Sequence, residues 1–324
     1  METLRLGTRG SQLALQQANA VRALLARHAG VDCEIVVIRT SGDRLAEAPL
    51  STVGGKRLFV KEIEEALLDG AIDVAVHSSK DLPAALPEGL AIGAALPRED
   101  PRDAIVMPGP PGEPFPSIEA AVAALGQTPR IGTSSVRRTA QLLRLFPGGR
   151  FMPIRGNLET RLRKVDAGDY DALVLAAAGL RRLDRADRIS ACLPPAACVP
   201  APGQGIVAIE IREGDERARG LVAGVDDPDA AAALAAERAV IRRLGGGCQL
   251  PVGAYAAASR DGLALTGVVV SLDGSRAVKG EAAGAAVEAE DLGAAVAEQL
   301  LDQGAADIIE EVQRAQGAAE GIRP

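Results

Sequence analysis

A cysteine preceded by three glycines is the residue best suited to form a covalent bond with a large organic group. Cys248 follows Gly245, Gly246 and Gly247, and Pro251 comes shortly after it. Glycines adopt backbone conformations that other residues avoid and leave the approach to the sulfur open, and a thiolate is a good nucleophile. The alternative is a buried structural cysteine beside a glycine-rich turn, because free cysteines are among the most buried residue types. The motif alone favours neither interpretation.

A carboxylate beside a lysine follows an apolar stretch that predicts a buried strand at 72–76. Residues just past the carboxyl end of such a strand face the ligand crevice of an open α/β sheet. Asp81 with Lys80 could therefore stabilise a cation or transfer a proton. The alternative is a polar turn in which Asp81 stabilises the following Leu-Pro corner. His77 is better explained as a strand-end histidine with a hydrogen-bond partner than as a base.

Two turns of similar sequence, at 6–11 and 131–135, open predicted helices with a glycine, a threonine and further polar residues. The free N–H groups of a helix start hold anions well, although such turns also occur as plain helix caps. Arg137 and Arg138 lie in the first turn of a predicted helix, where the helix dipole disfavours cations. They are easier to explain if they face an anion. Together with the turns, they favour a ligand that carries carboxylate or phosphate groups.

The overall charge gives these arginines further weight. The chain has 36 Lys and Arg residues against 43 Asp and Glu, a formal net charge of −7, which argues against nucleic-acid binding. Arginines that gather between 130 and 188 in an acidic protein indicate an internal anion site. A solvated helix face is a fair explanation for several of them, namely Arg144, Arg150, Arg163 and Arg185.

The elements that must position these residues alternate between strand and helix. Strands are predicted at 4–7, 33–39, 72–76, 130–132, 151–154, 172–177 and 206–211, and helices at 11–29, 59–68, 118–125, 135–146, 157–167 and 229–244. This alternation predicts two α/β units with mostly parallel sheets. A run rich in proline and glycine at 107–116 predicts an exposed loop. Strands at 252–257, 263–270 and 277–281 and a helix from 289 predict a small α+β domain at the end.

The composition limits the remaining possibilities. Arg, Asp, Glu or Pro interrupts every apolar stretch, so no membrane span is expected, and the first residues resemble neither a signal nor a transit peptide. We therefore predict a cytoplasmic protein. Four cysteines without CxxC spacing and two histidines predict neither a metal site nor a disulfide framework.

Taken in order, several motifs resemble the porphobilinogen deaminase (hydroxymethylbilane synthase) family. They lie at 7–11, 54–62, 77–83, 132–138, 155–161, 178–183, 202–205 and 244–253. The resemblance runs from residue 4 to about 255, and beyond that point it concerns only size and pattern. The chain departs from the family in two places. Ser79 stands where a larger residue is common, and the 107–116 loop is longer than usual.

The resemblance implies two α/β domains like those of periplasmic binding proteins around a cleft, and a small C-terminal α+β domain. The expected boundaries are 1–98 with 200–222, then 102–198, then 224–324. It also implies a transferase of tetrapyrrole (porphyrin and heme) biosynthesis that carries one dipyrromethane cofactor, attached to Cys248 through a thioether. Four porphobilinogen units extend this primer with loss of ammonia, and water releases hydroxymethylbilane.

The resemblance assigns roles to residues of this chain. Asp81 and Lys80 are expected to be catalytic and to bind the cofactor together with Ser78, Thr133, Ser134, Ser135, Arg137, Arg138, Arg155, Gly156 and Gln204. Substrate binding is expected at Arg9, Ser11, Phe59, Arg155, Arg161 and Arg182. Lys56 is expected to lie on an active-site loop. The expected partner is porphobilinogen alone, without metal, nucleic acid or membrane, and the protein is expected to be a monomer.

One alternative belongs to a different class. A non-catalytic two-lobed protein that captures a small anion would explain the helix-start turns and the arginines. It would not explain Cys248 or the position of Asp81.

Overall fold

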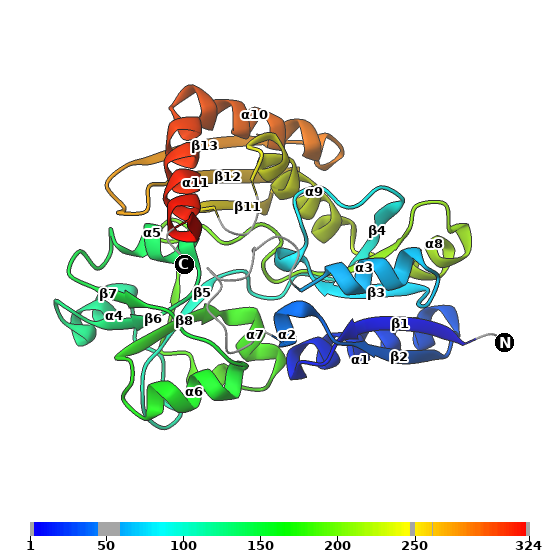
Figure 1. Cartoon of the computed structure of the whole chain (residues 1–324), viewed down its shortest axis with the longest axis horizontal. Helices are drawn as coiled ribbons and strands as arrows, with labels where there is room; N and C mark the ends of the chain where they lie inside the picture. The colour runs from blue at the N-terminus through cyan, green and yellow to red at the C-terminus, as the bar shows by residue number, and fades with distance from the viewer. Residues whose placement is uncertain (1–2, 45–58, 247–249, 261, 322–324) are drawn as a thin grey trace.

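The computed structural model describes residues 3–44, 59–246, 250–260 and 262–321, and its strands form three sheets (Figure 1). The first sheet has the strand order β2-β1-β3-β10-β4. Its strands are β1 (Leu4–Arg9), β2 (Cys33–Ile38), β3 (Val74–Ser78), β4 (Leu90–Ala95) and β10 (Val207–Arg212). β1 pairs in parallel with β2 and β3, whereas β10 is antiparallel to β3 and β4.

The second sheet repeats this pattern in the order β7-β6-β8-β5-β9. It contains β5 (Asp103–Val106), β6 (Arg130–Gly132), β7 (Arg150–Met152), β8 (Ala172–Ala176) and β9 (Ala191–Leu193). β6 is parallel to β7 and β8, and β5 is antiparallel to β8 and β9. The prediction of mostly parallel sheets is therefore wrong, because β5 and β10, which each follow a crossing from the other sheet, enter antiparallel. Two α/β units with mixed sheets are what the structure contains.

Helices cover both sheets. Those near the first sheet are α1 (Gln12–Ala29), α2 (Ser41–Arg44), α3 (Lys61–Leu68) and α8 (Glu216–Ala223), and those near the second are α4 (Ile118–Leu125), α5 (Val136–Leu142), α6 (Leu158–Asp166) and α7 (Ala177–Arg182). α1 shows why they form where they do. Ser11 caps its start by accepting from Ala14 N, and Gly30 ends it with a φ of 62°. Ala18, Val21 and Leu25 recur at helical spacing and are buried.

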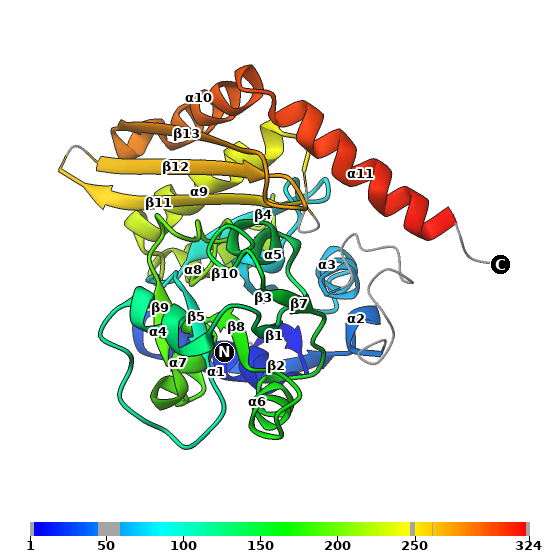
Figure 2. The same cartoon turned by 90° about the vertical axis from the view of Figure 1, so that its left-hand side faces the viewer.

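The third sheet is antiparallel and consists of β11 (Val252–Ser259), β12 (Gly262–Val270) and β13 (Ala277–Gly284). α9 (Pro228–Arg243) and α10 (Ala289–Asp302) pack against it. α11 (Ala305–Gly321) packs its first turns on the same core and then extends beyond the sheet (Figure 2). A Cβ atom on Gly267 would lie 2.6 Å from Val296 Cγ1, so this glycine lets α10 approach β12 closely. The predicted α+β domain is confirmed.

Several boundaries differ from those predicted. β3 ends at Ser78 rather than at 76, and the helix predicted at 135–146 ends at Leu142. The 107–116 run contains neither helix nor strand and is largely exposed, as predicted. The predicted fold class, two α/β units followed by a small α+β unit, is confirmed. In the described ranges, no helix combines the length and the apolar character needed to span a membrane.

Candidate active site

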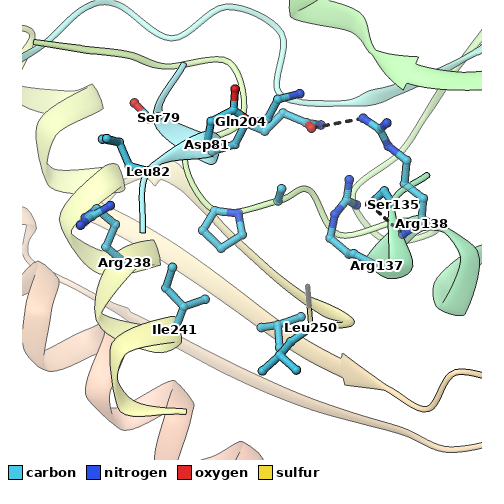
Figure 3. A pocket seen from close by; sticks show the side chains of 14 residues that line it. Ser79, Asp81, Leu82, Ser135, Arg137, Arg138, Gln204, Arg238, Ile241 and Leu250 are labelled. Carbon is cyan, nitrogen blue, oxygen red and sulfur yellow. Dashed lines mark hydrogen bonds between the residues drawn. The ribbon is translucent and has the colours of Figure 1, made fainter. Parts of the chain in front are cut away.

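A cavity of about 200 Å³ lies between the turn after β3, the start of α5, helix α9 and the start of β11 (Figure 3). It is lined by Ser79, Lys80, Asp81, Leu82, Ser135, Arg137, Arg138, Ala201, Pro202, Gln204, Arg238, Ile241, Leu250 and Val252. We call it the main cavity because it contains more of the site residues predicted from the sequence than the other cavities described below. Six of its residues are among those predicted from the sequence: Lys80, Asp81, Ser135, Arg137, Arg138 and Gln204. Its wall combines several cationic side chains with one carboxylate, which suits an anionic ligand of mixed polarity.

Asp81 is reached from β3 by a single turn of 3-10 helix. Strand β3 ends at Ser78, the turn covers Ser79–Asp81, and Leu82 N donates to Ser79 O. Asp81 also lines a second, smaller cavity of about 60 Å³. This small cavity contains four more residues predicted from the sequence, Arg9, Ser11, Phe59 and Ser78. Asp81 therefore stands in the wall of both cavities.

The Lys80 ammonium has an unusual electrostatic environment. Burial and the nearby charge of Arg138 lower its pKa to about 8, although Asp81 and Asp103 act in the opposite direction. A pKa near neutral means that Lys80 changes charge within the ordinary working range of an enzyme. It can therefore bind an anion when protonated and accept a proton when neutral.

Arg137 and Arg138 face an anion, but that anion is a residue of the protein. Asp103, the first residue of β5, is completely buried and accepts from Arg137 Nη1 at 2.8 Å and from Arg138 Nε at 2.9 Å. Burial alone would raise the pKa of Asp103, but the two guanidinium charges hold it well below its usual range. Asp103 was not predicted from the sequence, because no motif marks it and its one distinguishing feature is its position at the start of a short apolar run.

The rest of this network is also buried. Gln204 Nε2 donates to Asp103 Oδ1 at 2.9 Å. Figure 3 shows the second contact of this side chain, in which Gln204 Oε1 accepts from Arg138 Nη2 at 3.4 Å. The Cys198 thiol donates to Asp103 Oδ2 at 3.3 Å, while burial and this carboxylate raise its pKa to about 12. Arg138 Nη1 donates to Val174 O at 3.0 Å. The network joins the second sheet to the segment that returns to the first.

The predicted anion-binding turn at 133–135 is held mainly by its own hydrogen bonds. Ser135 caps α5 by accepting from Arg138 N, and Thr133 Oγ1 accepts from Ser135 N at 3.3 Å. Ser134 Oγ donates to Ile154 O at 2.7 Å. Of these three residues, only Ser135 lines the main cavity. Plain capping, the alternative interpretation of this turn, explains most of what the three side chains do here.

Arg155 and Arg161 line none of the cavities named above, yet Arg161 interacts electrostatically with Arg138 and Asp81, which line the main cavity. Burial, together with Arg138 and Arg155, lowers the pKa of Arg161 to about 10, and Asp81 acts to raise it. Arg161 Nε donates to Gly156 O at 2.8 Å. Gly156 has a φ of 106°, and a Cβ there would lie 2.7 Å from Thr160 Cγ2, so the position requires glycine. Arg155 and Gly156 therefore belong to the turn that presents Arg161.

The remaining predicted arginines are already engaged. Arg9 Nη2 pairs with Asp43 at 2.6 Å, and its guanidinium lies 4.2 Å from the centre of the Phe59 ring. Arg182 Nη2 donates to Gly205 O at 2.6 Å and lines a third cavity, of about 300 Å³, beside α1. Burial lowers the pKa of Arg182. These contacts orient both side chains. Arg9 lines the small cavity, whereas Arg182 lines the third one.

His77 has the partner that its position predicted. Its Nε2 lies 3.0 Å from Glu210 Oε2, and both side chains are buried. Two further residues were missed by the sequence reading: Arg238, which lines the main cavity, and Glu237, which pairs with Arg98. Both lie on α9, where their neighbours in sequence give no hint of a distant partner.

Cys248 and Lys56 lie outside the described residues. The main cavity nevertheless extends to Leu250 and Val252, close to Cys248 in the sequence. Burial raises the pKa of the other three thiols, Cys33, Cys192 and Cys198. In the parts of the chain that the structure describes, no cluster of three or more His, Cys, Asp and Glu side chains is arranged to hold a metal ion.

The fold and the site together define a two-lobed α/β protein that has a cationic cavity between its lobes and a third, α+β unit beside it. Two family descriptions match the sequence. "Porphobilinogen deaminase, dipyromethane cofactor binding domain" matches residues 4–220, and "Porphobilinogen deaminase, C-terminal domain" matches residues 231–302. The chain belongs to the porphobilinogen deaminase (hydroxymethylbilane synthase) family.

Curated relatives agree with this assignment. A porphobilinogen deaminase of Geobacter metallireducens is 49% identical over 318 residues, which cover 98% of this chain and 97% of the relative. Another, of Syntrophobacter fumaroxidans, is 47% identical and covers 96% of this chain and 98% of the relative. Enzymatic activity in tetrapyrrole biosynthesis with a dipyrromethane cofactor is thereby established, and the alternative of a non-catalytic anion-binding protein is set aside.

The solved structures that match this chain include two binding proteins. A periplasmic substrate-binding protein of an ABC transporter from Coxiella burnetii gives a TM-score of 0.42 at 12% identity, covering 73% of this chain and 97% of that chain. The methionine binding protein MetQ gives 0.42 at 13% identity, covering 69% and 88%.

Proposed function

We propose that the main cavity holds the dipyrromethane cofactor and that Asp81 is the residue at which each porphobilinogen unit reacts. The observation that carries this proposal is the position of Asp81 in the wall of both cavities. A carboxylate shared by two adjoining cavities can contact the end of a chain in one and the incoming unit in the other. Lys80, next to it, lines the main cavity but not the small one.

The residues of the main cavity fit a ligand that bears carboxylates. The Nε atom of Arg137 is buried and has no hydrogen-bond partner within the described structure. Such a donor calls for an acceptor from a ligand. Arg137, Arg138, Lys80 and Ser135 would hold carboxylates here, with Gln204 keeping Arg138 in place, and Cys248 would carry the thioether. When bound, the dipyrromethane supplies the nucleophilic pyrrole carbon to which the first porphobilinogen unit is added.

The charge of Asp81 suits the chemistry of the substrate. When the aminomethyl group of porphobilinogen loses ammonia, positive charge develops on the carbon that bonds to the chain. A carboxylate directed at that position stabilises the charge more in the transition state than in the ground state. The new bond displaces a proton from the attacking pyrrole carbon, and Asp81 is close enough to both cavities to accept it. Lys80 would bind substrate carboxylates or assist this proton transfer.

The small cavity suits the incoming porphobilinogen. Arg9 and Ser11 would bind its carboxylates, and Phe59 would stack on its ring. Arg155, Arg161 and Arg182 would hold carboxylates of rings added earlier, and Lys56 would belong to a loop over the site. Ser78, Thr133, Ser134 and Gly156 would support the cofactor side through the turns that they form.

The same proposal covers domain organisation and cellular context. We assign domain 1 to 1–98 with 200–222, domain 2 to 102–198 and domain 3 to 224–324. Support comes from the sheets, because β10 joins the first sheet after the chain has formed the second. We also propose a monomeric, cytoplasmic enzyme, in keeping with a small soluble substrate.

Intact-mass measurement of the purified protein tests the proposal. The wild type should exceed its sequence mass by one dipyrromethane, and Cys248→Ala should lose both the excess mass and the activity. Cys192→Ala is the matched control and should keep both. A fully active protein without the added mass would contradict the proposal, as would a Cys248→Ala variant that retains it.

A further inference from the structure

Asp103 is a buried carboxylate beside the main cavity that accepts four hydrogen bonds, although it does not line the cavity. Its side chain is completely buried. Oδ1 accepts from Arg138 Nε and from Gln204 Nε2, each at 2.9 Å. Oδ2 accepts from Arg137 Nη1 at 2.8 Å and from the Cys198 thiol at 3.3 Å. Every donor thus comes from another segment of the chain.

The two arginines are held to different extents. Arg138 has an acceptor for each guanidinium nitrogen: Asp103 for Nε and Nη2, and Val174 O for Nη1. Arg137 uses Nη1 for Asp103 and for Val199 O, but its buried Nε has no partner in the described part of the chain. Arg137 is therefore fixed at one end and retains a donor for a ligand.

The charges of this cluster explain why such a residue is needed. Two adjacent guanidinium groups, both less than a tenth exposed, repel each other and lose their hydration in the folded protein. One buried carboxylate between them leaves a net charge of about +1 from the three groups. The cavity can then form before any cofactor is present and still attract an anion.

We propose that Asp103 is a positioning residue for cofactor assembly. It neutralises one of the two guanidinium charges, immobilises Arg138 and directs Arg137 towards the main cavity. This inference rests on the proposed function, because it takes the ligand of Arg137 to be a carboxylate of the dipyrromethane. Asp103 itself touches neither cofactor nor substrate.

Inorganic sulfate provides a test that does not depend on the cofactor. Asp103→Asn leaves the second guanidinium charge without a counter-charge, so the cluster should take up small anions more readily. Thermal unfolding is followed in sodium sulfate and in sodium chloride of matched ionic strength. We expect the apparent dissociation constant for sulfate to fall about tenfold in Asp103→Asn, which corresponds to about 1.4 kcal/mol. A purely structural role would lower the melting temperature without changing this constant.

Cofactor assembly provides the second measurement. Protein made without porphobilinogen is exposed to it, and intact mass follows the gain of dipyrromethane. Asp103→Asn should assemble at least about tenfold more slowly than wild type. Asp103→Glu, which keeps the charge, should recover part of the rate and the wild-type response to sulfate. The matched control is Asp171→Asn, because Asp171 binds Arg130 through both oxygens at a more exposed position of the same sheet.

Two results would overturn the inference. One is an Asp103→Asn protein that assembles cofactor and responds to sulfate as the wild type does. The other is failure of both Asp103→Asn and Asp103→Glu to fold with or without sulfate, which would assign Asp103 to folding alone. A wild type that never gains dipyrromethane would instead refute the proposed function, and the sulfate comparison would still decide the role of Asp103.

Discussion

Arg98 Nη1 donates to Glu237 Oε1 at 2.6 Å, and this ion pair connects the segment after β4 to helix α9 of the third unit. Glu237 is fully buried and also accepts from Gly203 N at 2.6 Å and from Ala256 N at 2.8 Å. Arg98 and Gly203 lie on the two segments by which the chain passes between the first and second sheets. One carboxylate therefore fixes both crossings against the third sheet.

Glu237→Gln should strongly destabilise the protein. The substitution keeps the size of the side chain but leaves the mostly buried Arg98 without its counter-charge, and breaking such a pair typically costs about 3–5 kcal/mol. Chemical denaturation measures the loss. Glu298→Gln, which breaks the exposed pair with Arg243, is the control and should cost about 1 kcal/mol or less. Equal losses in the two variants would show that Glu237 does not fix the crossings.

Local sequence signals predicted the residues that lie at element ends. Asp81 was placed by the apolar strand before it, and Ser11 and Ser135 by the turns that open α1 and α5. The same signals could not supply partners from distant segments. Asp103 is 34 residues from Arg137 and 101 from Gln204, so only the folded chain brings them together. The sequence therefore predicted Arg137 and Arg138 as site residues, but it predicted neither Arg238 nor the carboxylate that holds the pair.

The sheets show a similar limit. β4, β5 and β9 were not predicted, and all three lie close to the crossings between sheets. Hydrophobic pattern identifies a strand but not its direction. Direction depends on where the chain enters the sheet, and β5 and β10 enter from the other one. For this reason the sequence pattern could not predict that each sheet contains both parallel and antiparallel strand pairs.

Lys80 should impose a pH dependence on substrate capture. Burial and Arg138 lower its pKa to about 8, so the free enzyme loses this positive charge as the pH rises through that value. We expect kcat/KM to fall above about pH 8, because an uncharged Lys80 binds carboxylates less well. Lys80→Met should be less active and should lack this decline. Lys61→Met, on the exposed start of α3, is the control and should keep the wild-type profile.

The same shift has the opposite effect on stability. Above pH 8 the unfolded chain still binds a proton at Lys80 that the folded protein has released. The contribution of Lys80 to the free energy of unfolding therefore rises with pH until the ordinary lysine pKa is reached. In Lys80→Met this rise should be absent. An unchanged pH profile of both kcat/KM and stability in Lys80→Met would show that Lys80 does not titrate in this range.

The three described thiols should resist alkylation. Burial raises the pKa of Cys33, Cys192 and Cys198, that of Cys198 to about 12, so little thiolate forms at pH 8. Native Cys248→Ala treated with iodoacetamide should show no added mass, whereas the denatured protein should gain three adducts, one for each thiol. Rapid modification of the native variant would mean that a second thiol is available for covalent chemistry.

Asp81→Asn should lower turnover much more than cofactor loading. The amide keeps the size of the side chain but loses the charge that faces both cavities. Loss of a group of this kind typically reduces kcat on the order of a hundredfold or more. Intact mass should first establish that the variant carries dipyrromethane, and steady-state rates then measure the effect. The control is Asp166→Asn, a surface carboxylate paired with Arg188. If the Asp81→Asn enzyme carried dipyrromethane and kept most of its activity, Asp81 would stabilise the turn rather than act in catalysis.

Leucine substitutions of the arginines should stop the reaction at different stages, because these residues lie in different cavities. Arg137 lines the main cavity, Arg9 the small one and Arg182 the third. Arg137→Leu should prevent cofactor assembly, whereas Arg9→Leu should load the cofactor and fail to bind the next unit. Arg182→Leu should load and begin elongation but accumulate a longer covalent intermediate. Each lost charge-assisted contact costs about 1.5–3 kcal/mol, enough to change the slow step.

Intact-mass spectra taken after brief exposure to porphobilinogen distinguish these stages, since each added ring increases the mass by a fixed amount. Arg163→Leu is the matched control, because Arg163 lies on the exposed face of α6 and should give the wild-type series of masses. Arg138→Leu and Arg161→Leu extend the comparison to Arg161, whose pKa Asp81 influences, and to Arg138, whose charge also acts on Arg161. If the variants all accumulated the same intermediate, the three cavities would not represent successive positions of the growing chain. Wild-type spectra and rates for most of them would exclude the arginines from ligand binding, even with dipyrromethane attached to Cys248.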